Sequence, residues 1–132
     1  MEYNLELINK AIQKSDEAML SALSNFKDKH YDACQNRLYY SIFYMVSALA
    51  YKENFITSKH SQLMGWFNKK YIYDENIFDT KIYAIYRESF SNRQKSDYDF
   101  TYTPTEEDLI ISIEETKYFL NSLKEYLSKL LG

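Results

Sequence analysis

The sequence has few of the residues that interrupt regular secondary structure. It contains only two glycines, Gly65 and Gly132, and one proline, Pro104. Folds built from many short strands need glycine and proline at their turns, so this composition favours a few long helices. Two glycines also cannot form a glycine-rich phosphate-binding loop, which removes the nucleotide-binding classes that depend on one.

Residues that bind metals are scarce as well. The single cysteine, Cys34, excludes an intramolecular disulfide and a cysteine-cluster metal site. Cys34 lies in an apolar helical pattern, so we expect a buried thiol. The two histidines, His30 and His60, are too far apart in the sequence to indicate a metal site. We therefore expect neither a metal nor another cofactor.

Long apolar runs are missing too. No run approaches the roughly 18 apolar residues that a membrane span needs, and the N-terminal MEYNLELINK lacks the apolar core of a signal peptide. We therefore expect a cytoplasmic protein with no membrane partner. Hydrophobic and charged fractions of 45% and 27% are typical of globular proteins, and residues 1–132 fit one domain.

Charge is distributed unevenly along the chain, whose net charge is −3. Residues 59–95 carry seven Lys and Arg against four Asp and Glu, whereas residues 96–132 carry three against eight. A net negative charge argues against a protein that coats nucleic acid in general. The basic middle third of the chain still allows a local basic cleft.

Apolar residues recur at steps of three and four, which predicts four long helices and one short one. A second, aromatic stripe in the second helix indicates that it is central to a bundle or lies in an interface. The expected fold is all-α, an antiparallel bundle of four long helices plus one short helix. The predicted helices cover about 4–28, 31–53, 59–70, 76 to the segment described next, and 104–130.

Capping signals mark two of these helix starts. Before the last helix, Thr103 as N-cap, Pro104 at the first helical position and Glu106 at the third form a capping box. Ser58 is a candidate cap for the short helix.

A polar segment, SNRQKSDYD at 91–99, follows the fourth helix and is predicted to be a junction. The planar guanidinium of Arg93 suits a phosphate, and the Tyr98 hydroxyl can orient or donate a proton when it is buried. In the alternative interpretation, Arg93 pairs with Asp97 or Asp99 and orders a junction between two helices.

Two more polar residues stand out. Arg37 lies inside the most apolar helix, where a guanidinium must be hydrogen-bonded or paired. Either it ties to a carboxylate on a neighbouring helix or it faces a phosphate. His60 lies near a helix start, where we expect a capping or hydrogen-bonding role. The candidate carboxylates for Arg37 are Glu88, Asp97 and Asp99.

Segments of the chain occur in an order that resembles the HEPN superfamily, in its subgroup of short free-standing prokaryotic proteins. They are NRLYYSIFYMVSAL at 36–49, SKHSQLMGWFNKKYI at 58–72, and RQKSDYD at 93–99 followed by EEDLIISIEETKYFL. The resemblance covers nearly the whole chain. It implies a helical bundle, usually a homodimer, and many members are metal-independent ribonucleases.

The resemblance also implies roles for the polar segment. The catalytic families carry an arginine, a polar neighbour and a histidine a few residues later. Arg93 and Gln94 match the first two, Tyr98 stands in place of the histidine, and no histidine follows. Tyr98 would assist proton transfer, either as a donor or after activation by Lys95. Tyrosine, whose pKa is about 10, is a poor general base at neutral pH.

Three functions follow as hypotheses. The favoured one is a nucleotide-, RNA- or partner-binding component of a toxin–antitoxin-like system with a minimal nucleotidyltransferase antitoxin. The alternatives are a metal-independent endoribonuclease toxin that uses Arg93 with Tyr98, Asp97 or His60, and a structural helical dimerisation module. In some related toxins the partner adenylylates a nearby tyrosine, and Tyr98 is in a comparable position. The expected binding residues are Arg37, His60, Gln94, Lys95 and Asp99.

Overall fold

The computed structural model describes residues 4–132, and within this range it contains five α-helices, one π-helical segment and no strand. This confirms the expected all-α fold of four long helices and a short one. The π-helical segment η1 directly continues the short helix α3. The elements are α1 Leu5–Lys27, α2 Tyr31–Lys52, α3 His60–Phe67, η1 Asn68–Asp74, α4 Thr80–Tyr98 and α5 Glu106–Leu131.

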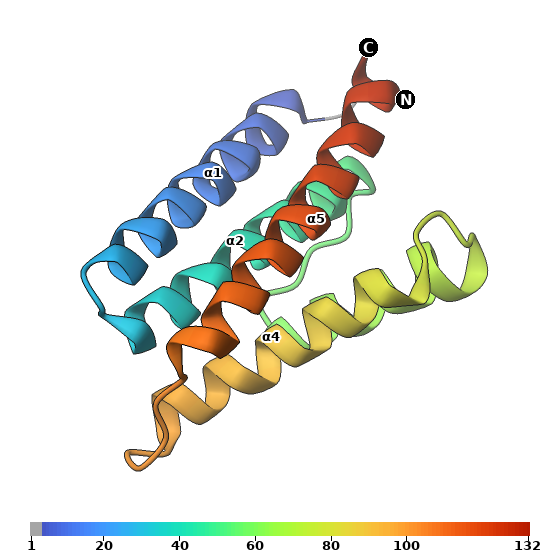
Figure 1. Cartoon of the computed structure of the whole chain (residues 1–132). Helices are drawn as coiled ribbons and strands as arrows, with labels where there is room; N and C mark the ends of the chain where they lie inside the picture. Colours follow the sequence, from blue (N-terminus) through green and yellow to red (C-terminus); the bar gives the residue numbers. More distant parts are fainter. Residues whose placement is uncertain (1–3) are drawn as a thin grey trace.

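Helix α2 is the centre of the bundle, because it contacts α1, α3, α4 and α5. α1 and α2 form an antiparallel pair, and α5 lies across α2 and α4 (Figure 1). The start of α1 and the end of α5 lie at the same end of the molecule. The two apolar stripes of α2 explain this position, since each needs a neighbour to cover it.

The core is made mainly of large aromatic and branched side chains. Phe67 is fully buried, and its ring contacts those of Tyr71, Phe78, Tyr86 and Phe119. A smaller cluster joins α1, α2 and α5 around Cys34, which is fully buried as expected. Burial raises the pKa of the Cys34 thiol to about 11. No helix within residues 4–132 is long and apolar enough to cross a membrane.

Both predicted caps are displaced in the structure. α5 begins at Glu106, and the hydroxyl of Thr105, not Thr103, accepts the Asp108 N–H at 3.1 Å. Either threonine can cap, but Thr105 is followed by three acidic residues that favour the positive end of the helix dipole. The predicted capping box at Thr103 is therefore wrong, and Pro104 precedes the helix.

The second displaced cap is at α3, which begins at His60 with Lys59 in the N-cap position and no side-chain cap bond. Thr57, not Ser58, provides the side chain that hydrogen-bonds to the backbone at the start of this helix. Its hydroxyl accepts the Lys59 N–H at 3.1 Å and donates to Gln62 Oε1 at 2.7 Å.

The polar segment 91–99 is not a junction, because α4 runs through Tyr98. No glycine or proline occurs in it, so nothing stops a helix that the Asp79 cap has started at Thr80. The helix ends where the Asp99 carboxylate accepts hydrogen bonds from the backbone N–H and hydroxyl of Thr101. Residues 91–98 therefore have a helical face directed at the core, which a connector would lack.

Candidate functional site

Arg93 lies on the face of α4 that packs against the bundle. It follows the buried Tyr86 by seven residues, which is about two helical turns and therefore the same side of the helix. Only 12% of its side chain is exposed. The guanidinium carbon lies 4.8 Å from the ring centroid of Tyr39, 5.8 Å from that of Tyr40 and 6.0 Å from that of Phe90. α4 therefore places a cation in an aromatic pocket beside α2.

The hydrogen bonds of Arg93 leave donor capacity unused. Nη1 donates to the Asp97 carboxylate at 3.2 Å. Nε is buried, and no group in residues 4–132 accepts its hydrogen. A guanidinium has five N–H donors, and a buried donor without an acceptor costs about 1–3 kcal/mol. The expected pairing of Arg93 with Asp97 is confirmed, although it lies within one helix rather than between two.

His60 lies close to Arg93, because both side chains contact Tyr39. Its ring stacks on Phe43 with centroids 4.3 Å apart, and its Nδ1 lies 2.8 Å from the Tyr39 hydroxyl. This confirms the expected hydrogen-bonding role. Tyr39 thus presents its ring to the Arg93 cation and its hydroxyl to the imidazole. The bundle assembles an arginine and a histidine that are remote from each other in the sequence.

Protonation in this cluster follows from burial and the Arg93 charge. Burial, and then the positive charge of Arg93, lower the pKa of His60 below its ordinary value. Burial raises the pKa of the Tyr39 phenol far above its ordinary value, against a smaller opposing effect of Arg93. At neutral pH the imidazole is neutral and the phenol protonated. In the tautomer that donates Nδ1–H to Tyr39, the His60 Nε2 can accept a proton.

The contacts of Arg37 differ from one of its two expected roles, the tie to a carboxylate on a neighbouring helix. Its Nε and Nη2 donate to Asn36 Oδ1 at 3.1 and 2.8 Å, and its guanidinium carbon lies 4.9 Å from the centroid of the Tyr40 ring. Within residues 4–132 it forms no ion pair, so the expected tie to Glu88, Asp97 or Asp99 is wrong. Arg37 is only half-buried, and its neighbouring amide satisfies part of the guanidinium in place of a carboxylate. Tyr40 is therefore shared by Arg37 and Arg93.

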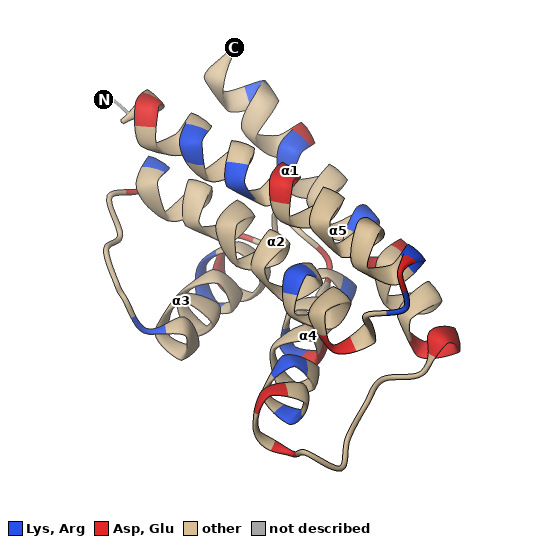
Figure 2. Cartoon of the chain, turned by 90° about the vertical axis from the view of Figure 1, so that its left-hand side faces the viewer, with Lys and Arg blue, Asp and Glu red and all other residues tan. Residues whose placement is uncertain are grey.

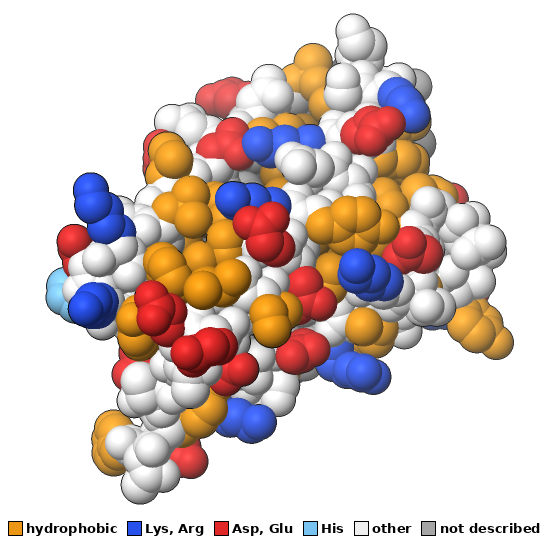
Figure 3. Space-filling model, in the orientation of Figure 1, with side chains coloured by type: hydrophobic (Ala, Val, Ile, Leu, Met, Phe, Trp, Pro, Cys, Tyr) orange, Lys and Arg blue, Asp and Glu red, His pale blue; other side chains and the backbone are white. Residues whose placement is uncertain are grey.

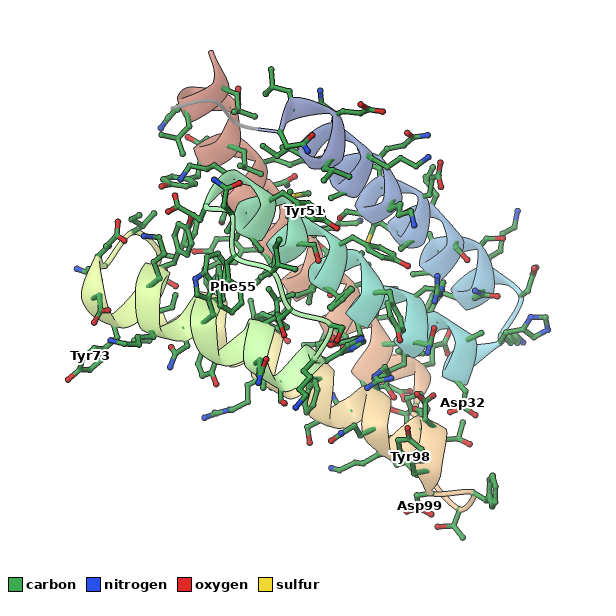
Figure 4. All side chains as sticks on the ribbon, turned by 180° about the vertical axis from the view of Figure 1, so that it is seen from behind. Asp32, Tyr51, Phe55, Tyr73, Tyr98 and Asp99 are labelled. Carbon is green, nitrogen blue, oxygen red and sulfur yellow. The ribbon has the colours of Figure 1, made fainter. Side chains whose placement is uncertain are left out.

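Other residues proposed from the sequence lie away from the Arg93 pocket. Tyr98 follows Arg93 by five residues, which places it about 140° around the helix, and it is 77% exposed. Figure 4 shows Tyr98 and Asp99 at the end of α4. Three of the predicted residues are exposed: Gln94, Lys95 and Asp99. The structure brings Asp97 and His60 to Arg93 and leaves Tyr98 outside the pocket.

Sequence reasoning missed the aromatic walls of this pocket, Tyr39, Tyr40 and Phe90. The signal was present, because Tyr39 and Tyr40 belong to the aromatic stripe of α2. That stripe indicated a buried or interface face, but periodicity does not say which residue of another helix will lie against it.

The lowered pKa of His60 predicts how stability depends on pH. On unfolding, His60 regains an ordinary pKa near ~6.5, so at lower pH the unfolded chain binds a proton that the folded chain resists. This stabilising contribution is complete above the unfolded pKa and is lost as pH falls through the folded one. We expect urea unfolding between about pH 7.5 and 5.5 to show a smaller pH-dependent loss in His60→Gln than in the wild type.

The matched control is His30→Gln, which makes the same substitution at the other, exposed histidine. Equal pH dependence in His60→Gln and the wild type would contradict the prediction.

Comparisons with known proteins identify the family of this chain. The HEPN domain family matches residues 8–126. Two similar proteins come from Methanocaldococcus jannaschii. "Putative toxin MJ0142" is 31% identical over 96% of this chain and 85% of its own length, and "Putative toxin MJ0605" is 30% identical over 96% and 92%. A "UPF0332 protein" of Thermotoga maritima is 25% identical over 89% of each chain. Because the family match spans the bundle and the pocket, this chain belongs to the HEPN domain family.

Proposed function

We propose that this protein is a toxin-type component of a two-protein system, and that Arg93 binds a phosphodiester group of RNA. One observation carries the proposal: the guanidinium lies among aromatic rings with 12% of the side chain exposed, and Nη1 is its one donor with an acceptor within residues 4–132. Phosphate oxygens offer acceptors that match the guanidinium fork. The names of the two archaeal relatives support the toxin-type role.

The rings around Arg93 favour a nucleotide over a free phosphate. Tyr40, Phe43 and His60 are only half-buried and lie beside the guanidinium or stack on one another. Aromatic faces next to cations bind bases by stacking while the cations bind the backbone. This combination suits RNA or a nucleotide.

A second candidate function is a metal-independent endoribonuclease, and the His60–Tyr39–Arg93 cluster favours it. Arg93 would stabilise the charge on the phosphate while the 2′-hydroxyl attacks phosphorus. His60 Nε2 would accept the hydroxyl proton, the new P–O2′ bond would form, and the bond to the 5′-oxygen would break. The leaving oxygen would take a proton from water. The products would be a 2′,3′-cyclic phosphate and a 5′-hydroxyl. In this mechanism His60 replaces the histidine that the segment after Arg93 lacks.

The proposal includes the partners that the family resemblance implies, a second copy of the chain and a minimal nucleotidyltransferase antitoxin. The Tyr98 hydroxyl is well exposed at the end of α4, which makes it accessible to a modifying partner. Apolar residues outside the pocket, Phe100, Ile110 and Ile111, are exposed and offer surface for a second copy. Light scattering at micromolar concentration tests the dimer.

The function is tested with purified protein and end-labelled RNA in the presence of EDTA. We expect fluorescence anisotropy to show binding of single-stranded RNA, and the second function further predicts that gel analysis shows fragments with 2′,3′-cyclic phosphate ends. Binding without fragments would support the first function and contradict the second. Absence of binding would contradict both.

A further inference from the structure

We propose that a groove between α1 and α2 binds single-stranded RNA and continues the Arg93 pocket. This inference rests on the proposed function and specifies the form of its ligand. Two adjoining cavities, with volumes of about 260 and 320 Å³, form the groove and share Lys14 and Tyr44. The first is also lined by Lys10, Phe43 and Tyr51, and the second by Glu17 and Arg37.

The groove pairs cations with aromatic faces. Lys14 Nζ lies 5.5 Å from the centroid of the Tyr44 ring, and the Arg37 guanidinium lies 4.9 Å from that of Tyr40. These tyrosines are half-buried, so part of each ring remains accessible. Single-strand binding sites combine such rings, which stack bases of any sequence, with cations that follow the backbone. Stacking on exposed rings requires unpaired bases, so the chemistry favours a single strand over a duplex.

Two aromatic residues connect the groove with the Arg93 pocket. Phe43 lines the groove and stacks on His60, and Tyr40 lies between Arg37 and Arg93. Along α2 the distance from Arg37 to Tyr51 is about 21 Å, enough for on the order of six nucleotides stacked ~3.4 Å apart. Figure 2 shows α1 and α2 side by side with basic positions on both helices, and Figure 4 shows Tyr51 near the far end of α2.

Charge distinguishes RNA from a second copy of the chain as the occupant. A two-fold interface here would place the cations of the groove against their own copies. Among the described residues that line the groove, Glu17 is the single acid, against Lys10, Lys14 and Arg37. Such a surface repels itself and attracts a polyanion.

The test compares two RNA lengths by fluorescence anisotropy, a labelled adenosine 12-mer and the labelled dinucleotide ApA. In the double variant Lys10→Gln/Lys14→Gln we expect weaker 12-mer binding and a salt slope reduced by about 1.4, since each single-strand phosphate contact contributes ~0.7. Tyr44→Leu should weaken 12-mer binding by roughly 5-fold or more. ApA binding, which needs only the Arg93 pocket, should not change in either variant.

The matched control is Lys117→Gln/Lys129→Gln, which removes the same charge from exposed positions on α5. It should retain wild-type 12-mer binding, and circular dichroism should show all variants folded.

If the 12-mer binds no tighter than ApA, or the double variant behaves like its control, the groove proposal is wrong while binding of ApA at Arg93 stands. If wild-type protein binds neither RNA, both proposals fail. If groove substitutions convert a dimer into a monomer in light scattering, the groove is an interface between copies and the proposal is overturned.

Discussion

Arg93→Ala is expected to weaken binding of single-stranded RNA by at least ~10-fold, because a hydrogen bond to a charged group contributes about 1.5–3 kcal/mol. The loss should be large because the aromatic rings around the guanidinium shield it from water, and Nη1 is its one donor with an acceptor within the described protein. Anisotropy titration with the adenosine 12-mer and with ApA measures it. Both RNAs should be affected, since both place a phosphodiester at the same guanidinium.

The control for Arg93 is Arg87→Ala, on the same helix but exposed, with its guanidinium carbon 5.9 Å from the centroid of the Tyr83 ring. It should bind RNA as the wild type does.

Asp97→Asn gives an independent check that does not depend on truncating the arginine. It removes the carboxylate that competes for Nη1, so RNA affinity should rise. Equal losses in the two arginine variants, or weaker binding by Asp97→Asn, would show that Arg93 does not hold the phosphate.

If the protein is an endoribonuclease that uses His60 as a base, His60→Gln is expected to slow RNA cleavage by about 10²–10⁴-fold, the usual contribution of a general acid or base. Affinity for RNA should fall much less than the rate, because Arg93, Tyr40 and Phe43 remain and glutamine can still hydrogen-bond to Tyr39. This separation of rate from affinity would not result from a general loss of structure. Single-turnover cleavage at saturating protein, followed on gels, measures the rate.

The pH dependence of cleavage gives the His60 prediction a second readout. Proton acceptance needs the neutral imidazole, whose pKa is lowered by burial and by Arg93. The wild-type rate should therefore hold at neutral pH and fall as the pH decreases through that lowered pKa, whereas residual cleavage by His60→Gln should lack this fall. Tyr39→Phe removes the hydroxyl bonded to Nδ1 and should show a smaller loss of rate. A wild-type rate in His60→Gln would assign proton transfer to another group.

Local sequence was a good guide to the helices, and it placed the ends of α1 and α2 much better than those of α4. α1 and α2 match the predicted ranges within a residue, since their apolar periodicity is regular and long. At α4 the polar character of 91–99 suggested a connector. Helix formation depends more on the absence of breakers and on i,i+4 pairs such as Arg93–Asp97 than on polarity.

The distribution of surface charge was also predictable from the sequence only in part. The acidic run after residue 96 is visible in the sequence, and in the structure acidic side chains gather over α5 (Figure 3). The basic groove was not visible as a unit, because Lys10 and Lys14 lie on α1 and Arg37 on α2. Their separation in the sequence hides a proximity that the antiparallel packing of the two helices creates.

The sequence by itself determined the all-α class and the burial of Cys34, restricted α2 to a central or an interface position, and made Arg93 a candidate, because composition, periodicity and residue chemistry are local properties. Only the tertiary structure decided which partners Arg93 has. Helical geometry turns Tyr98 to another side of α4, while packing of α2, α3 and α4 brings Tyr39 and His60 to the guanidinium. Such contacts depend on how helices pack in space, and one-dimensional periodicity carries no information about the residues that meet across that packing.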